Sequence, residues 1–106
     1  MDMEKEIFEI ISNGGDAKAM AYEALELAHE NDFQQAEEKL KEANQTLNTA
    51  HNTQTKLIQA ELNGEGVPMT LLMVHAQDHL MAAISEMSLI ENMIKLLKRI
   101  SELEKN

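Results

Sequence analysis

The chain has 106 residues, a length that suits one continuous hydrophobic core, and we predict a single domain over residues 1–106. Nineteen acidic against nine basic residues give a formal net charge of −10, which argues against binding to nucleic acid or to an anionic membrane surface. The sequence contains no cysteine, so disulfides, zinc–thiolate sites and thiol nucleophiles are excluded. Four glycines, one proline and no tryptophan are typical of an all-α protein. No apolar stretch approaches the roughly 20 residues that span a bilayer, so we expect a soluble, cytoplasmic protein without direct membrane insertion.

The first predicted helix carries small and apolar residues at alternating steps of three and four, the spacing of a packing seam. This seam comprises Ile7, Ile10, Gly14, Ala17, Ala21, Ala24 and Ala28. The segment 13–16, Asn-Gly-Gly-Asp, lies inside the helix, and each glycine costs about 1 kcal/mol relative to alanine. We therefore expect a kink or a short break there, with Asp16 as the cap of a restarted helix. The helix should end at residues 30–32.

A second helix is predicted after a tight turn, because Asp32 followed three residues later by Gln35 resembles a capping box. Its seam has the same alternating spacing and comprises Phe33, Ala36, Leu40, Ala43, Leu47, Ala50, Gln54 and Leu57. The segment 63–68, Asn-Gly-Glu-Gly-Val-Pro, should end this helix, since glycine suits a C-terminal cap and proline cannot continue a helix.

The third predicted helix begins after Thr70, a suitable N-cap, and runs to about Leu103. One of its seams comprises Met73, Ala76, Leu80, Ala83, Met87, Ile90, Ile94 and Leu97. A second seam lies beside it and comprises Leu71, His75, Asp78, Ala82, Ser85, Leu89 and Leu96. This helix is apolar over more of its circumference than two partner helices would cover. We predict an antiparallel three-helix bundle whose second seam on this helix faces another subunit.

Three polar side chains interrupt the apolar start of this helix. His75, Asp78 and His79 stand at i, i+3 and i+4, so they share one face. No lysine or arginine occurs between Lys56 and Lys95 to pair with them. Because such groups are costly in apolar surroundings unless something pairs with them, they form the candidate functional site.

His75 has the position of a phosphorylatable histidine. A neutral imidazole nitrogen is a good nucleophile at physiological pH. With Thr70 as N-cap, the positive end of the helix dipole lies close by and stabilises an incoming phosphoryl group by about 0.3–1 kcal/mol. The sequence holds no Walker loop or kinase motif. The chain would therefore relay phosphate and not draw it from ATP itself.

Other interpretations fit the same residues. A histidine on an apolar face is often a core residue satisfied by a neighbouring carbonyl. A His–Asp–His patch also resembles part of a metal site in a helical bundle, although the other two seams offer no matching carboxylates. A structural assembly could use the patch only to fix its register. A histidine-phosphotransfer domain of a signalling relay is the alternative that keeps a phosphorylated histidine.

Three segments carry a resemblance to a known family: Gly-Gly-Asp-Ala at 14–17, Ala-His-Asn-Thr-Gln-Thr at 50–55, and Met-Thr-Leu-Leu-Met-Val-His-Ala-Gln-Asp-His-Leu-Met at 69–81. The chain resembles, over nearly its whole length, the lactose/cellobiose-type enzyme IIA of the bacterial phosphoenolpyruvate-dependent sugar phosphotransferase system. The resemblance implies a phosphotransferase component that works through a phosphohistidine. His75 would accept phosphate on Nε2 from HPr and pass it to the cognate IIB, which phosphorylates sugar entering through IIC. The motif favours a cellobiose- or chitobiose-like β-linked disaccharide, with lactose possible.

The resemblance also implies a homotrimer with nine helices, in which the active histidines lie in clefts between subunits. The three copies of Asp78 would meet near the trimer axis and bind one divalent cation, for which oxygen ligands favour Mg²⁺; the alternative is that Asp78 pairs with a histidine of a neighbour. His79 is expected to donate a hydrogen bond to the phosphate or to orient the active ring, or else to be a satisfied interface histidine. Gln77 lies about 200° around the helix from His75, so it would contact the phosphoryl group only through its backbone or across the subunit cleft.

The methionines of the third helix have two interpretations, as adaptable core residues or as part of an apolar docking surface for HPr. Met73 and Met81 flank the histidine motif in the sequence. Together they are expected to form an apolar docking surface on an otherwise acidic protein, which suits a quick and weak encounter.

Overall fold

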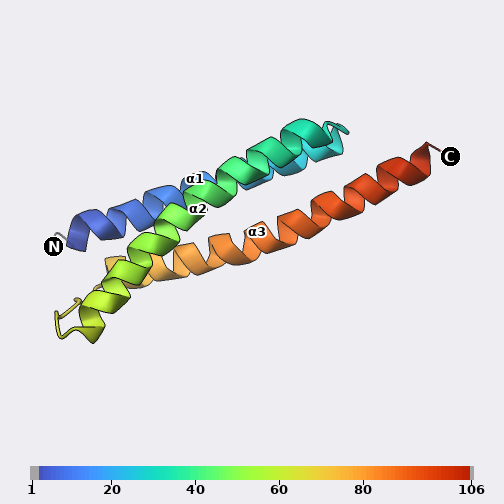
Figure 1. The fold of residues 1–106 in the computed structure, drawn as a ribbon. Coiled ribbons are helices and arrows are strands. Elements are labelled where there is room, and N and C mark those ends of the chain that lie inside the picture. Colours follow the sequence, from blue (N-terminus) through green and yellow to red (C-terminus); the bar gives the residue numbers. More distant parts are fainter. Residues whose placement is uncertain (1–2, 106) are drawn as a thin grey trace.

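The computed structural model describes residues 3–105, which form three helices and no strand: α1 (Met3–His29), α2 (Phe33–Leu62) and α3 (Leu71–Glu104). They form an elongated bundle with extents of 61 × 21 × 16 Å, in which α2 runs antiparallel to α1 and α3 (Figure 1). α1 packs along both other helices, whereas α2 and α3 contact each other much less. The prediction of an all-α subunit with three helices is confirmed over these residues.

α1 passes through Gly14 and Gly15 as one helix, so the predicted interruption at residues 13–16 is wrong. Glycine can adopt helical backbone angles and keeps its N–H group, so it weakens a helix without breaking it. Gly14 is buried in the bundle with the alanines of the same seam. Packing of this face against α2 and α3 therefore outweighs the local propensity.

The caps follow the sequence. An Oδ1 atom of Asp32 accepts a hydrogen bond from the backbone N–H of Gln35 at 3.2 Å, which starts α2. The hydroxyl of Thr70 accepts one from the backbone N–H of Met73 at 3.1 Å, which starts α3. Gly64 has a φ of 86° in the turn after α2, a conformation that glycine adopts without strain. The second and third helices therefore begin directly after the residues predicted to cap them.

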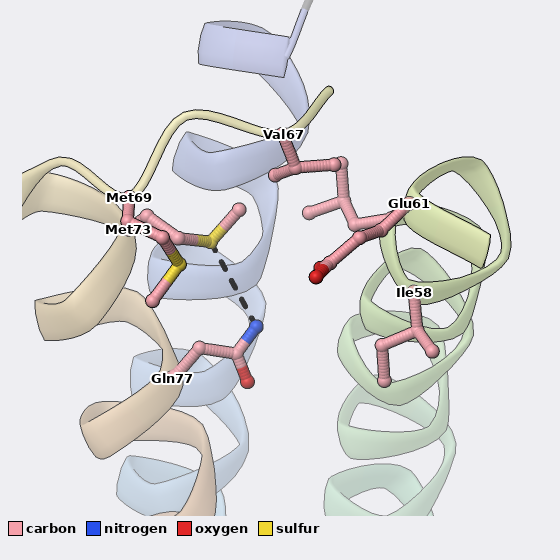
Figure 2. Close-up of a pocket in the computed structure, with 7 residues that line it drawn as sticks. Ile58, Glu61, Val67, Met69, Met73 and Gln77 are labelled. Carbon is pink, nitrogen blue, oxygen red and sulfur yellow. Dashed lines mark hydrogen bonds between the residues drawn. The ribbon is translucent and has the colours of Figure 1, made fainter. Parts of the chain in front are cut away.

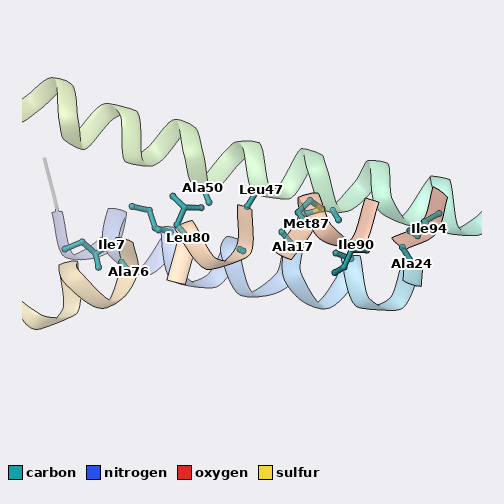
Figure 3. Close-up of a cluster of buried hydrophobic side chains, with 14 of the residues drawn as sticks. Ile7, Ala17, Ala24, Leu47, Ala50, Ala76, Leu80, Met87, Ile90 and Ile94 are labelled. Atoms are coloured by element: carbon teal, nitrogen blue, oxygen red, sulfur yellow. The ribbon is translucent and has the colours of Figure 1, made fainter. Parts of the chain in front are cut away.

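One seam of each helix forms the core (Figure 3). All seven predicted seam residues of α1 are buried. On α3 the first predicted seam is buried from Met73 to Ile94, while every residue of the second seam is exposed in the single subunit. No helix among residues 3–105 has a stretch both long and apolar enough to cross a bilayer. α3 thus directs one face into the bundle and leaves a second apolar face without a partner in its own chain.

Candidate functional site

The three polar residues predicted to share one face of α3 lie in two different surroundings. His75 and Asp78 are exposed on the outward face of the helix, whereas His79 is half-buried on the side of α1. The interpretation of His75 as a core histidine of this bundle is therefore wrong. The Thr70 cap fixes where α3 begins and hence which way each of these side chains points.

The rings of His75 and His79 are stacked. Their centroids lie 5.9 Å apart and their planes differ by 18°. The spacing of i and i+4 on a helix brings the two rings into this arrangement. His79 is therefore the side chain of α3 that borders the face of the His75 ring.

The other side of His79 lies against α1. A Cβ atom built on Gly15 would lie 3.4 Å from Nε2 of His79, and one built on Gly14 would lie 3.6 Å from Cδ2 of the same ring. The Cδ2–Nε2 edge of His79 thus faces the two glycines, and Nδ1 lies on the opposite side of the ring. The glycines that favour an interruption of α1 instead make room for the imidazole.

A charged cluster joins α1 to α3 beyond His79. Lys18 Nζ lies 2.9 Å from one carboxylate oxygen of Glu86, and the Tyr22 hydroxyl donates a hydrogen bond of 2.7 Å to the other. Hydrogen bonds from Lys18 and then Tyr22 are the main causes that hold the pKa of Glu86 below its usual value, with a further contribution from the charge of His79. The same contact raises the pKa of Lys18. The sequence pattern did not single out this cluster, although Glu86 stands seven residues after His79 and therefore on the same face of α3.

Gln77 lies on a different side of α3, next to α2. Its side-chain carbonyl accepts a hydrogen bond from Gln54 Nε2. Its own Nε2 points to the sulfur of Met73 at 3.8 Å (Figure 2). Met73 and Gln77 border a groove of about 200 Å³, whose other lining residues are Leu57, Ile58, Glu61, Val67 and Met69. In one subunit the Gln77 side chain therefore points away from His75, as its 200° offset predicts.

Met73 is buried, so the prediction that it belongs to an exposed docking surface is wrong. The first seam of α3 takes it into the core. Met81 is 55% exposed and Val74 is 49% exposed, so both are available at the surface on one flank of His75. Leu71, one turn before His75, is 86% exposed.

Asp78, predicted as a cation ligand, lies on the outward face of α3. Its carboxylate is exposed, and no ion pair among residues 3–105 involves it. Within the described part of one chain, no group of three His, Asp or Glu side chains is arranged to hold a metal ion, so a single subunit supplies no such centre. Carboxylate oxygens are suitable ligands for a hard divalent cation. A cation site at Asp78 would therefore have to be completed by other copies of the chain.

Comparison with known proteins identifies the family. Residues 5–98 match the family model described as "PTS system, Lactose/Cellobiose specific IIA subunit". The chain belongs to the lactose/cellobiose-specific IIA family. It is therefore a IIA component of the sugar phosphotransferase system, and IIA components are phosphotransferases that pass phosphate through a phosphohistidine. Family membership favours this function over the signalling relay that the sequence left open.

Relatives agree over almost the full length of the chain. The lichenan-specific phosphotransferase enzyme IIA component of Bacillus subtilis is 46% identical over 101 residues, which cover 95% of this chain and 92% of that protein. The crystal structure of the cellobiose-specific enzyme IIA from Bacillus anthracis superposes with a TM-score of 0.92 at 38% identity, covering 96% of this chain and 94% of that one. The chitobiose IIA of Escherichia coli, solved in complex with HPr, superposes with a TM-score of 0.83 at 34% identity, covering 95% and 98%. The two structural likenesses extend over all three helices.

Proposed function

We propose that this IIA chain accepts a phosphoryl group from phospho-HPr on Nε2 of His75 and passes it to a cognate IIB component on the cytoplasmic side of the membrane. IIB would then phosphorylate a β-linked disaccharide entering through IIC. The observation that carries the proposal is the exposed imidazole of His75 near the capped N-terminus of α3, in a chain of the IIA family.

The chemistry needs a nucleophile that phosphorus can reach and a leaving group that can be displaced again. The lone pair of Nε2 attacks the phosphorus, the bond between phosphorus and HPr breaks, and the reverse exchange with IIB frees the imidazole. Exposure of His75 lets both partners approach the same ring in turn. The nearby N-terminus of α3 favours the added negative charge.

HPr as donor is supported by the relative that was solved in complex with HPr. The acidic chain, with a net charge of −10, would attract a basic docking surface. Val74 and Met81 would supply the apolar part of the contact beside His75. Charge attraction with a small apolar contact suits a complex that forms quickly and also dissociates quickly.

A homotrimer of nine helices is supported by the unpartnered face of α3. Besides Val74 and Met81, which are assigned to the HPr contact, six large apolar side chains of this helix are at least 44% exposed in the subunit: Leu71, Leu89, Met93, Leu96, Ile100 and Leu103. Monomeric proteins rarely expose so long an apolar stripe. His75 and Asp78 lie on the same side of the helix as this stripe. Assembly through it would place the active histidines beside subunit boundaries.

We propose that Asp78 carboxylates from the three subunits hold one Mg²⁺ ion between them. A divalent cation would offset the repulsion between three carboxylates brought close together. Under the alternative, in which the patch only fixes the register, Asp78→Leu would stabilise the oligomer. Native mass spectrometry with Mg²⁺ distinguishes the shared metal site from a purely structural role of Asp78. We expect one ion per trimer, lost in Asp78→Asn, whereas an unchanged metal content in this variant would contradict the site.

His79 and Gln77 are proposed as contacts of the phosphoryl group. His79 has Nδ1 on the side of its ring away from α1, where a hydrogen bond to an outside group is possible. The side chain of Gln77 is held by Gln54, so its contact would come from the backbone or across the subunit boundary. A cellobiose- or chitobiose-like sugar is supported by relatives named for lichenan, cellobiose and N,N'-diacetylchitobiose, while lactose-specific relatives keep lactose possible.

The decisive experiment is phosphorylation in a mixture of phosphoenolpyruvate, enzyme I and HPr, read by intact-protein mass. The parent chain should gain one phosphoryl group per subunit, and omission of HPr should prevent the gain. His75→Ala should gain none, while His51→Ala, a change at an exposed histidine of α2, should behave as the parent. Phosphorylation of His75→Ala in this mixture would overturn the proposal.

A further inference from the structure

We propose that Gly15 of α1 is a positioning residue for phosphoryl transfer, because the absence of any atom beyond the Cβ position there lets the His79 ring lie against α1 and support the ring of His75. The proposal depends on the proposed phosphorylation of His75.

The space beside Gly15 is limited to a single carbon atom. A Cβ at this position would lie 3.4 Å from Nε2 of His79, which is ordinary van der Waals contact. A β-branched side chain in a helix is held in one strongly preferred rotamer, so its two γ atoms cannot both turn away from a neighbour. Alanine therefore fits beside the imidazole, whereas valine would displace it.

His79 transmits this contact to His75. The Cδ2–Nε2 edge of its ring faces the α1 glycines, and the ring of His75 is stacked with it, with centroids 5.9 Å apart. Core packing holds α1 and α3 together at this level, since Ala17 of α1 and Leu80 of α3 are both 0% exposed. Further along α1, Lys18 and Tyr22 also bind Glu86 of α3. A bulkier residue 15 would therefore move the ring and not the helices. Since His75 is otherwise exposed, its orientation would change with that of His79.

Orientation of the nucleophile matters because a misplacement of about 1 Å can cost on the order of 100-fold in rate. We expect Gly15→Val to slow single-turnover transfer from phospho-HPr at saturating HPr by at least about tenfold. Gly15→Ala should stay within about twofold of the parent, as the size argument requires. Ala19→Val is the control for a β-branched residue in α1, because residue 19 is exposed on the same helix. It loses helix propensity, whereas Gly15→Val gains some, so a slower transfer in Gly15→Val alone cannot come from a weakened helix.

A double-mutant cycle shows whether Gly15 acts through His79. If it does, Gly15→Val should add less than about a twofold further loss in a His79→Ala background. The ring ¹H and ¹⁵N resonances of His75 in the unphosphorylated protein should shift in Gly15→Val and not in Ala19→Val. Thermal melts identify any variant that has lost its fold. In that case Gly15→Ser, which adds one atom beyond Cβ, takes the place of the valine variant, with a smaller loss expected.

The proposal would be overturned if Gly15→Val lowered the transfer rate by the same factor in the parent and in the His79→Ala background. It would also be overturned if Gly15→Val transferred phosphate at the rate of the parent. The failure of the proposed function looks different, since His75→Ala would then still accept phosphate. The resonances of His75 test the contact in either case, because they require no transfer.

Discussion

Leu89 tests whether the outward face of α3 is a subunit interface. Truncating leucine to alanine removes three carbons, or about 2.4 kcal/mol of burial at about 0.8 kcal/mol per carbon when the side chain is fully covered. Leu89 is 56% exposed in the subunit, so about 1.3 kcal/mol of that value is gained only if neighbouring subunits cover it. Three copies would contribute about 4 kcal/mol to one trimer. The loss of this contribution in Leu89→Ala should raise the dissociation constant of the trimer on the order of 1,000-fold.

Sedimentation equilibrium over a range of protein concentrations measures this constant directly. The matched control is Leu62→Ala, the same truncation at an exposed leucine of α2 outside the apolar stripe, which should leave the association unchanged. A parent chain that is monomeric at micromolar concentration would refute the reasoning. A trimer that is equally tight in Leu89→Ala would refute the use of this stripe as the interface.

Three further changes test the subunit itself. Leu80 is fully buried, so Leu80→Ala should lower the free energy of unfolding by about 3–5 kcal/mol through lost burial and a cavity, measured by chemical denaturation. Thr70→Ala should cost about 1 kcal/mol in the same assay because the first turn of α3 loses its cap. The pKa of Glu86 is held below its usual 4.5, so its stabilising contribution is complete above that pH and is lost as the pH falls through the lower folded value. The melting temperature of the parent should therefore fall more on acidification below about pH 4.5 than that of Glu86→Gln.

Conservative changes serve as controls for these predictions. Thr70→Ser keeps a hydroxyl acceptor and should retain most of the stability. Glu61→Gln removes an exposed carboxylate outside the cluster with Lys18 and Tyr22, so its melting temperature should follow the parent on acidification. Equal acid sensitivity of Glu86→Gln and the parent would contradict the assigned role of this carboxylate, and a loss below about 1 kcal/mol in Leu80→Ala would contradict its place in the core.

Seams and caps are predictable because they depend on neighbours in the sequence. Alternating steps of three and four identify which side of each helix is apolar, and a side chain that caps a helix contacts a backbone group three residues away. Asp32 and Thr70 can therefore be assigned from local sequence alone, and their hydrogen bonds confirm both assignments. The proposal of His75 as the nucleophile uses the same local information, because the residue follows the cap of α3 by five positions in the sequence.

The sequence-based predictions fail where the surroundings of a residue are set by another helix. Gly14 and Gly15 predict an interruption of α1 because local propensity is all that a single segment reveals, but they face His79 of α3. Met73 stands close to His75 in the sequence, yet the seam of α3 buries it away from the surface. The cluster around Glu86 escapes a sequence-based prediction because its partners are 64 and more positions away in the chain.

The sequence by itself determined three amphipathic helices and their caps, and it placed a histidine proposed as the nucleophile near the start of the third, since periodicity and capping are local properties of a helix. Only the tertiary structure decided which polar groups of α3 face outward and which meet α1. That depends on the rotation and separation of packed helices, which follow from how their side chains fit together. For this IIA chain the separation of α1 and α3 at Gly15 leaves room for one imidazole, and His79 occupies it.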